Sequence, residues 1–295
     1  MVGLRRWSGA AVAFGLAAAL TIFGGISAAA ATTVNLGNAT PFAVLAGTAV
    51  TSTGLTTIYG DVGTDPGPAA PTGFPPGIVE PPSTIYTADG VALDAQNDLT
   101  TAYGQAAGEG PPTTEPADLT GLILDPGVYQ TSSDGALSLS GALTLDGEGN
   151  PNAVFIFQTG SSLTTGTSST VTLINDASAC NVFWQVGSSA ALDGPLFAGN
   201  VLALTSITVG SAVTVDGRVL ARNGDVTFID DDINASACTT PLAAPTPTPS
   251  PGTGTPTTGA GGTEGGALLV ICGLALLGAG AVAATIRRRR WTSPQ

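Results

Sequence analysis

The chain carries little of the chemistry on which most enzymes depend. Its 295 residues include no histidine and no lysine, so the usual general base, the commonest zinc ligand and the Schiff-base amine are missing. Serines are numerous, but no His or Lys can activate them as nucleophiles. Carboxylate pairs could act as in glycosidases, yet none lies in an aromatic-rich stretch. The sequence predicts a protein that is not an enzyme and has no cofactor.

Two acidic stretches offer metal chemistry as an alternative. Asp146–Asn150 and Asp230–Asn234 place oxygen ligands at alternating positions, and such hard ligands suit Ca²⁺. Neither stretch completes an EF-hand, because the invariant glycine and the distal glutamate are absent from both. Acidic clusters of this kind are more often turns, so no metal site is predicted and calcium binding stays an alternative.

The N-terminus has the pattern of an export signal. Arg5 and Arg6 precede the apolar stretch Ala10–Ile26, and the small residues Ser27–Ala31 offer cleavage sites. Residues 1–31 are therefore expected to be a secretory signal peptide.

The C-terminus has the pattern of an anchor. Residues 267–286 carry no charge and are long enough to span a bilayer, and the basic tail 287–295 would stay in the cytoplasm. Before them, residues 241–266 are almost wholly Pro, Thr, Gly, Ala and Ser, a composition typical of a stalk. The remaining segment, residues 32–240, is expected to be an ectodomain on the extracellular face of the cell envelope.

A short motif in the stalk leaves the anchoring route open. Residues 255–259 read TPTTG, which resembles the sortase cell-wall sorting signal Leu-Pro-x-Thr-Gly. Pro256, Thr258 and Gly259 match that pattern, but Thr255 stands where leucine belongs. Cell-wall linkage and a membrane anchor through the C-terminal helix both remain possible.

The charge and the cysteines of the predicted ectodomain limit its partners and its chemistry. It holds two arginines against 20 acidic residues, a net charge of about −18, which excludes nucleic acid and anionic lipid as natural partners. Cys180 and Cys238 lie in the exported region, whereas Cys272 lies in the predicted span. An even pair outside the cell predicts one disulfide, which would add about 4 kcal/mol of stability by constraining the unfolded chain.

Near-repeats indicate a stack of similar coils. Three pairs of segments resemble each other at spacings of 27, 18 and 23 residues: 155–162 with 182–189, 199–203 with 217–221, and 186–194 with 209–217. Short apolar runs bounded by Gly, Asn, Asp or Ser fill the same region, and such repeated strands are typical of a β-solenoid. Phe155, Phe157, Phe183 and Trp184 are expected to fill its interior column.

Other segments complete the predicted architecture. Ala88–Ala107 has apolar residues at helical spacing, with Asp89 in its first turn, so one amphipathic helix is expected to cover a solenoid side. Pro66–Pro82 reads as a loop. Val34–Asp65 reads as strands that pair with coils formed later in the sequence.

Several motifs in order resemble one known family. They are Leu36–Gly54, Ile58–Gly67, Thr72–Val79, the Ala/Asp/Gln-rich helix, Leu124–Ser133, Asn150–Thr165 and Cys180–Leu192. Together they are similar to the microbial ice-binding protein family, over residues 35–234. The resemblance implies a mainly β fold, a discontinuous right-handed β-solenoid (a three-sided β-helix) with one long α-helix packed alongside.

The resemblance also implies a partner and a site. One flat Thr-, Ser- and Ala-rich side would meet the surface of an ice crystal, and some members carry a Thr-Ala/Gly-x-Thr/Asn motif there. Stretches 48–51 and 53–56 match this motif, and 211–214 departs from it at its first residue. The candidate ice-binding residues are Thr48, Thr51, Thr53, Thr56, Thr164, Thr165, Thr167, Ser189, Ala190, Ser211 and Thr214.

Two further alternatives remain for the ectodomain. An envelope adhesin or scaffold without ice affinity would use the same stalk and solenoid, and would be favoured if bulky or charged residues broke the Thr-rich side. A polysaccharide lyase would need Arg218 or Arg222 as its base. Arg218 occupies a repeat position where its equivalent is Asn200, which predicts decoration of a coil and argues against catalysis.

Overall fold

The computed structural model describes residues 31–131 and 135–238 of the chain. The predicted stalk, membrane span and basic tail, the sorting-like residues Pro256, Thr258 and Gly259, and all but the last residue of the predicted signal peptide lie outside these ranges. Within the described ranges, no helix is long and apolar enough to cross a membrane.

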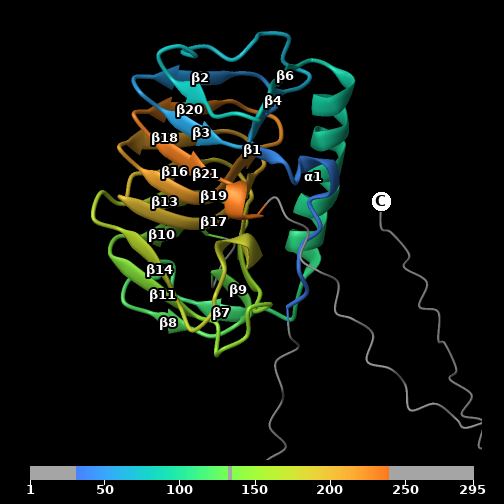
Figure 1. The fold of residues 1–295 in the computed structure, drawn as a ribbon. Coiled ribbons are helices and arrows are strands. Elements are labelled where there is room, and N and C mark those ends of the chain that lie inside the picture. The colour runs from blue at the N-terminus through green and yellow to red at the C-terminus, as the bar shows by residue number, and fades with distance from the viewer. Residues whose placement is uncertain (1–30, 132–134, 239–295) are drawn as a thin grey trace, which may run out of the picture. The chain divides into compact units, whose positions relative to one another are not determined.

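The described strands form two parallel sheets that enclose a common core and give the stack three sides (Figure 1). The six-stranded sheet is called the flat side below. It contains β2 (Val50–Thr53), β10 (Leu137–Leu139), β13 (Leu163–Thr165), β16 (Ala190–Leu192), β18 (Ile207–Ser211) and β20 (Val226–Ile229).

The fifteen-stranded sheet supplies the other two sides. The side under the helix, the helix side, contains β1 (Phe42–Ala46), β4 (Asp61–Thr64), β6 (Ile85–Thr87), β7 (Thr113–Glu115), β9 (Gly127–Thr131), β12 (Phe155–Thr159) and β15 (Val182–Val186). The third side contains β3 (Thr57–Tyr59), β5 (Ile78–Val79), β8 (Ile123–Leu124), β11 (Ala142–Asp146), β14 (Thr170–Ile174) and β21 (Asp232–Asn234). Three short 3-10 helices also occur: Gly37–Ala39, Ala179–Asn181 and Ser236–Cys238.

Two long strands, β17 (Leu196–Ala203) and β19 (Thr214–Ala221), run through both of these sides. Each contains a glycine with positive φ, Gly199 at 118° and Gly217 at 142°, and the two glycines stack in register. A Cβ atom on Gly217 would lie 2.1 Å from the carbonyl oxygen of Gly199. The corner between the sides therefore requires glycine, both for its backbone conformation and for the close approach of the next coil.

The stack is discontinuous in sequence. Strands β1, β2 and β3 pair with β19, β20 and β21, so the first coils lie against the last ones, as expected for residues 34–65. Helix α1 (Gly90–Gly108) then runs along the stack to its opposite end, where β7 to β10 begin the return (Figure 1). The segment expected to be a loop, residues 66–82, is irregular except for the two-residue strand β5.

The helix is the one that the apolar spacing predicts. The side chain of Asp89 caps it by accepting a hydrogen bond of 2.9 Å from the Ala92 backbone N–H. Its buried stripe is mostly alanine, which lets the helix lie close to the sheet. Helix and sheet share one apolar cluster. It contains Ala95, Leu99, Ala102 and Ala106 of the helix, and Phe42, Leu45, Val128, Ile156, Phe183, Leu202 and Leu220 of the fifteen-stranded sheet.

The interior column contains most of the aromatic residues predicted for it. The rings of Tyr129, Phe157, Trp184 and Phe197 follow one another at centroid distances of 5.5, 4.1 and 5.1 Å. Phe155 lies in the same core, but Phe183 does not. Phe183 alternates with its neighbour Trp184, so its side chain faces the helix. The prediction for Phe183 was wrong because the strand has apolar residues on both faces.

The repeats at spacings of 27 and 18 residues are true coil equivalents. Phe155 pairs with Val182, and Gly199 pairs with Gly217. The 23-residue near-repeat does not relate equivalent positions of two coils. Val186 and Val209 begin the two similar segments, but Val186 pairs with Ala203 and Val209 pairs with Leu192. The similarity of those two segments reflects a shared turn composition.

The predicted disulfide between Cys180 and Cys238 is present. Beside it lies Arg218, which is only 1% exposed, so the prediction that it decorates the outside of a coil is wrong. Its guanidinium donates hydrogen bonds to the carbonyl oxygens of Thr40 and Cys238 and to Oδ1 of Asn200, at 2.6 to 3.0 Å. Arg218, on β19, thereby connects the neighbouring strand β17 with the turn before β1 and the 3-10 helix after β21.

Candidate functional site

The flat side presents one continuous line of small side chains. Its strands pair in register, and the outward residue at the centre of each strand faces its equivalent on the next coil. This line, called the central file below, continues by one bridge beyond β2; at its other end a second bridge pairs Ser138 with Asp118, an exposed carboxylate that terminates the file. In spatial order it consists of Ser138, Thr164, Ala191, Thr208, Thr227, Thr51 and Thr72.

Alternation along each strand explains why these residues face outward. The two neighbours of each central residue in the six strands are buried, as in Leu137 and Leu139 around Ser138, or Val226 and Phe228 around Thr227. The pleat of a β-strand places successive side chains on opposite faces, so burying the neighbours forces the central residue out. The aromatic column behind the sheet belongs to the same core cluster as these buried apolar neighbours.

The central file is long, neutral and uniform. Its seven positions hold five threonines, one serine and one alanine, and the Asp118 carboxylate lies just beyond Ser138 at one end. Strands are about 4.8 Å apart, so seven residues extend over about 29 Å. Threonine is branched at Cβ and stiff at χ1, so each methyl and hydroxyl keeps a defined position.

A second row flanks the central file at the start of each strand. It includes Ser162, Ser189, Ser206, Asp225 and Ala49, which are connected by backbone hydrogen bonds between neighbouring coils. Its one carboxylate, Asp225, accepts a hydrogen bond from the Ser206 hydroxyl. The charge in this row is therefore engaged with a neighbouring coil.

The third side has a different surface. Its outward positions include the carboxylates Asp216 and Asp232 and the bulky residues Leu196, Ile78 and Tyr59, the last three between 38% and 50% exposed. Partial burial raises the pKa values of the Asp216 and Asp232 carboxyl groups above that of an ordinary aspartate. Of the two open sides in the described chain, only the flat side carries an unbroken neutral file.

The eleven residues proposed from the sequence fall into three groups. Thr51, Thr53 and Thr164 are exposed on strands of the flat side, and Ser211, at the end of β18, is exposed as well. Thr48, Thr167 and Ser189 are exposed in the turns at its edges. The other four lie away from the exposed surface of the flat side: Thr56, Thr165 and Ala190 are 0%, 1% and 2% exposed, and Thr214 lies on the third side, paired with Leu196 and Asp232.

The buried threonines connect coils within the stack. Oγ1 of Thr165 accepts a hydrogen bond of 2.8 Å from the Asp193 backbone N–H, and Oγ1 of Thr56 accepts one of 3.3 Å from Asp231. Sequence reasoning missed Ser138, Ala191, Thr208, Thr227 and Thr72. The available signal was the alternation apolar–Thr–apolar in residues 207–209 and 226–228.

The acidic stretches that suggested calcium form turns. Oδ1 of Asp146 accepts hydrogen bonds from the Glu148 N–H and from Nδ2 of Asn175, at 2.8 and 2.9 Å. Asp231 accepts from the backbone N–H groups of Val213 and Ile229 at 2.9 and 2.7 Å. Nowhere in ranges 31–131 and 135–238 do three or more His, Cys, Asp or Glu residues gather in a way that could hold a metal ion.

Asp231 titrates unusually. Burial raises the pKa of its carboxyl group to about 6, against the opposing effect of the two N–H donors, and the neighbouring Asp230 raises it further. The Asp230 carboxylate itself accepts a hydrogen bond of 2.6 Å from the Leu55 N–H. Both residues therefore close turns at the edge of the stack.

The fold and the surface define a class of protein: a parallel β-stack with one helix packed alongside, whose six-stranded sheet displays a file of small side chains in register. The chain belongs to the ice-binding-like family, whose model matches residues 44–234. It is 48% identical to the ice-binding protein of Nostoc sp. (strain HG1) over 217 residues, which cover 72% of this chain and 78% of that protein.

Solved structures of similar proteins agree with this assignment. An ice-binding protein from an Antarctic biological consortium is 42% identical, with a TM-score of 0.65 over 68% of this chain and 90% of its own. That of the Antarctic ascomycete Antarctomyces psychrotrophicus is 36% identical, with a TM-score of 0.65 over 69% and 98%. The family and the solenoid fold expected from the sequence are confirmed.

Proposed function

We propose that this protein binds the surface of ice crystals through the outward face of its flat side. The observation that carries the proposal is the central file, which is neutral, in register and free of bulky side chains over seven positions. Membership of the ice-binding-like family supports it, as do the names of the similar proteins.

The physical basis is the ordering of water by a fixed array. Threonine methyl groups restrict the water around them, while the hydroxyl groups hold that water by hydrogen bonds. Lysine or glutamate in the file would disturb such order, because flexible charged groups bind water strongly in many arrangements. A stiff, neutral and regular surface lets the ordered layer merge with the crystal.

The test is to measure thermal hysteresis and inhibition of ice recrystallisation for the purified protein and three single variants. Thr208→Tyr and Thr51→Tyr place a bulky ring on the central file, and both are expected to lower activity severalfold without changing the thermal unfolding temperature. Thr214→Tyr makes the same change on the third side and is the matched control, expected to keep full activity. Equal activity in all three variants would remove the flat side as the ice-binding surface.

The place of action is also part of the proposal: the protein is held on the outer surface of the cell. The predicted signal peptide, stalk and apolar C-terminal segment support export followed by tethering. Protease digestion of intact cells is expected to release the ectodomain. Deleting residues 267–295 is expected to send the protein into the medium, and retention of that variant on the cells would contradict a C-terminal tether.

The anchoring route can be separated by one substitution. If the TPTTG motif directs cell-wall linkage, Thr258→Ala leaves the protein in the membrane fraction, whereas it changes nothing for a membrane anchor. A purified protein without any effect on ice would leave the surface adhesin as the function that the tether and solenoid serve.

A further inference from the structure

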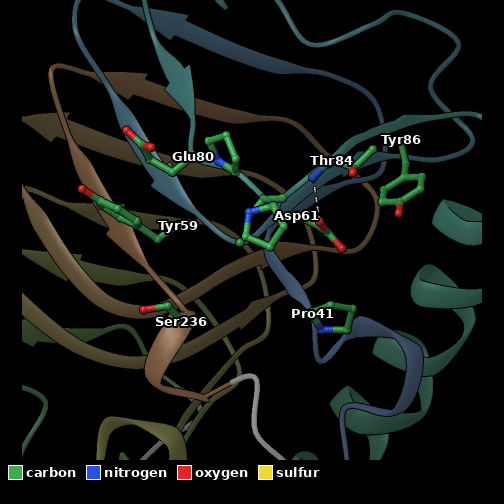
Figure 2. A pocket seen from close by; sticks show the side chains of 11 residues that line it. Pro41, Tyr59, Asp61, Glu80, Thr84, Tyr86 and Ser236 are labelled. Carbon is green, nitrogen blue, oxygen red and sulfur yellow. Dashed lines mark hydrogen bonds between the residues drawn. The ribbon is translucent and has the colours of Figure 1, made fainter.

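A hollow of about 380 Å³ opens near the end of the stack formed by the first coils, away from the flat side (Figure 2). It lies where β3, β4 and β6 meet the turn at residues 80–84 and the 3-10 helix at residues 236–238. Its volume is at the lower end of the range for small-molecule sites. The hollow takes no part in the proposed contact with ice.

The charged groups of the hollow lie at two separate positions. Glu80 lies with Tyr59 and Ser236 on one side in Figure 2, and Asp61 lies with Thr84 and Tyr86 on the other. The rings of Pro41, Pro81 and Pro82 also line it, so the hollow combines two carboxylates with an apolar wall.

The carboxylates have unused acceptor capacity. Oδ1 of Asp61 accepts a hydrogen bond of 2.8 Å from the Thr84 N–H, and its other oxygen has no hydrogen bond within the described residues. The Glu80 side chain likewise has none from any described residue. Burial raises the pKa of the Asp61 carboxyl group, against the opposing effect of that one N–H donor.

The cationic side chains of the described ranges are used elsewhere. Arg218 donates to backbone carbonyls and Asn200, and Arg222 lies over the ring of Tyr103, 4.9 Å from its centroid, with hydrogen bonds to Thr100. The hollow is therefore lined by negative charge alone, in a protein whose overall charge concentrates cations near its surface.

The aromatic residues favour an organic cation over a metal ion. Tyr59 and Tyr86 line the hollow, and aromatic rings attract ammonium groups. Tyr86 is held by its packing on Phe42 at a centroid distance of 5.6 Å. A group of three or more His, Cys, Asp or Glu residues that could hold a metal ion occurs neither at this hollow nor elsewhere in the described ranges.

We propose that this hollow binds an aliphatic diamine or polyamine, with one ammonium group at Asp61, another at Glu80, and the methylene chain against the prolines. The ammonium N–H groups donate to the free carboxylate oxygens. Because the two carboxylates lie at separate positions, the site favours a ligand with a charge at each end, and its methylene chain packs against the proline rings.

The test uses three small molecules of similar length: 1,4-diaminobutane with two charges, butylamine with one, and 1,4-butanediol with none. Calorimetric titration of the purified protein at low ionic strength is expected to show binding of the diamine and no binding of the diol. Butylamine is expected to bind about tenfold more weakly than the diamine, because one charge-assisted hydrogen-bonded pair is lost. Equal affinity for the diamine and butylamine would overturn the two-ended site. Absence of diamine binding would overturn the proposal altogether.

Variants localise the effect. Glu80→Gln and Asp61→Asn each remove one charge, and each is expected to reduce diamine affinity to the level of butylamine. Asp94→Asn removes an exposed carboxylate from α1 and is the matched control. A similar loss of affinity in Asp94→Asn would show general attraction by the acidic surface and contradict the site. Glu80→Gln is expected to keep full activity on ice, so the two proposals fail independently.

Discussion

Arg218 gives the sharpest test of how the coils are held together. Replacement by methionine keeps most of the side-chain volume and removes all of its donors. The carbonyl oxygens of Thr40 and Cys238 and Oδ1 of Asn200 then lose their partners in a buried region. The expected result is a less stable protein with an unchanged fold.

The magnitude follows from two opposing contributions. Three buried acceptors without donors cost about 1–3 kcal/mol each, or about 6 kcal/mol at the middle of that range. Burial lowers the pKa of Arg218 to about 10, which corresponds to about 3 kcal/mol for holding the charge inside the protein, and methionine removes that cost. The free energy of unfolding is therefore expected to fall by about 3 kcal/mol.

The assay is equilibrium denaturation by guanidinium chloride at pH 7, with the disulfide intact. Arg222→Met is the matched control, because Arg222 is partly exposed and its removal is expected to cost less than about 1 kcal/mol. Arg218→Lys keeps the charge but cannot reach all three acceptors, so it is expected to be destabilised as well. An Arg218→Met protein as stable as the wild type would refute the reasoning.

Three other predictions concern stability. Burial raises the pKa of the Asp231 carboxyl group to about 6, so the native protein holds this proton more tightly than the unfolded chain does. The free energy of unfolding of the wild type is therefore expected to fall by at most about 3 kcal/mol as pH rises from about 4 to 6. Asp231→Asn removes this carboxyl group, and denaturation curves of the variant should lack the fall. Ser52→Ala removes a buried hydroxyl that has no hydrogen-bond partner within the described residues, and thermal unfolding should show a protein at least as stable, by up to about 1 kcal/mol; clear destabilisation would mean that the hydroxyl is satisfied. Replacing Cys180 and Cys238 together by serine opens a link across 58 residues and is expected to lower the unfolding free energy by about 2–4 kcal/mol, and an unchanged denaturation midpoint would contradict this.

The fold could be predicted from the sequence because its determinants are local and repeated. Apolar runs bounded by turn residues mark each strand, and the 18- and 27-residue spacings match the observed registers of β17 with β19 and of β12 with β15. The helix was predicted within two residues at each end, since its alanine stripe and its cap at Asp89 both lie within one segment.

The composition of the flat side was harder to predict, for a physical reason. A four-residue motif does not distinguish the two faces of a strand, and this chain contains threonine on both: Thr164 faces outward, while its neighbour Thr165 faces inward and bonds to the next coil. Alternation with buried apolar residues, as around Thr208 and Thr227, is the stronger signal. Arg218 was misread because its acceptors come from residues 40, 200 and 238, and no local pattern relates them.

The pairing of the first coils with the last has a consequence for biogenesis. Strand β2 bonds on one edge to nearby Thr72, but its strand partner on the other edge is β20, about 175 positions later in the chain, so that edge has no neighbour until nearly all of the segment 32–240 has been synthesised. Contacts so distant in sequence form slowly, because a long loop must close before they stabilise anything. A polypeptide that cannot finish folding early stays unfolded for longer, and an unfolded chain is the form that can pass through an export channel. If the chain is exported as proposed, the stack would be completed after export, when strands β19 to β21 pair with the first coils.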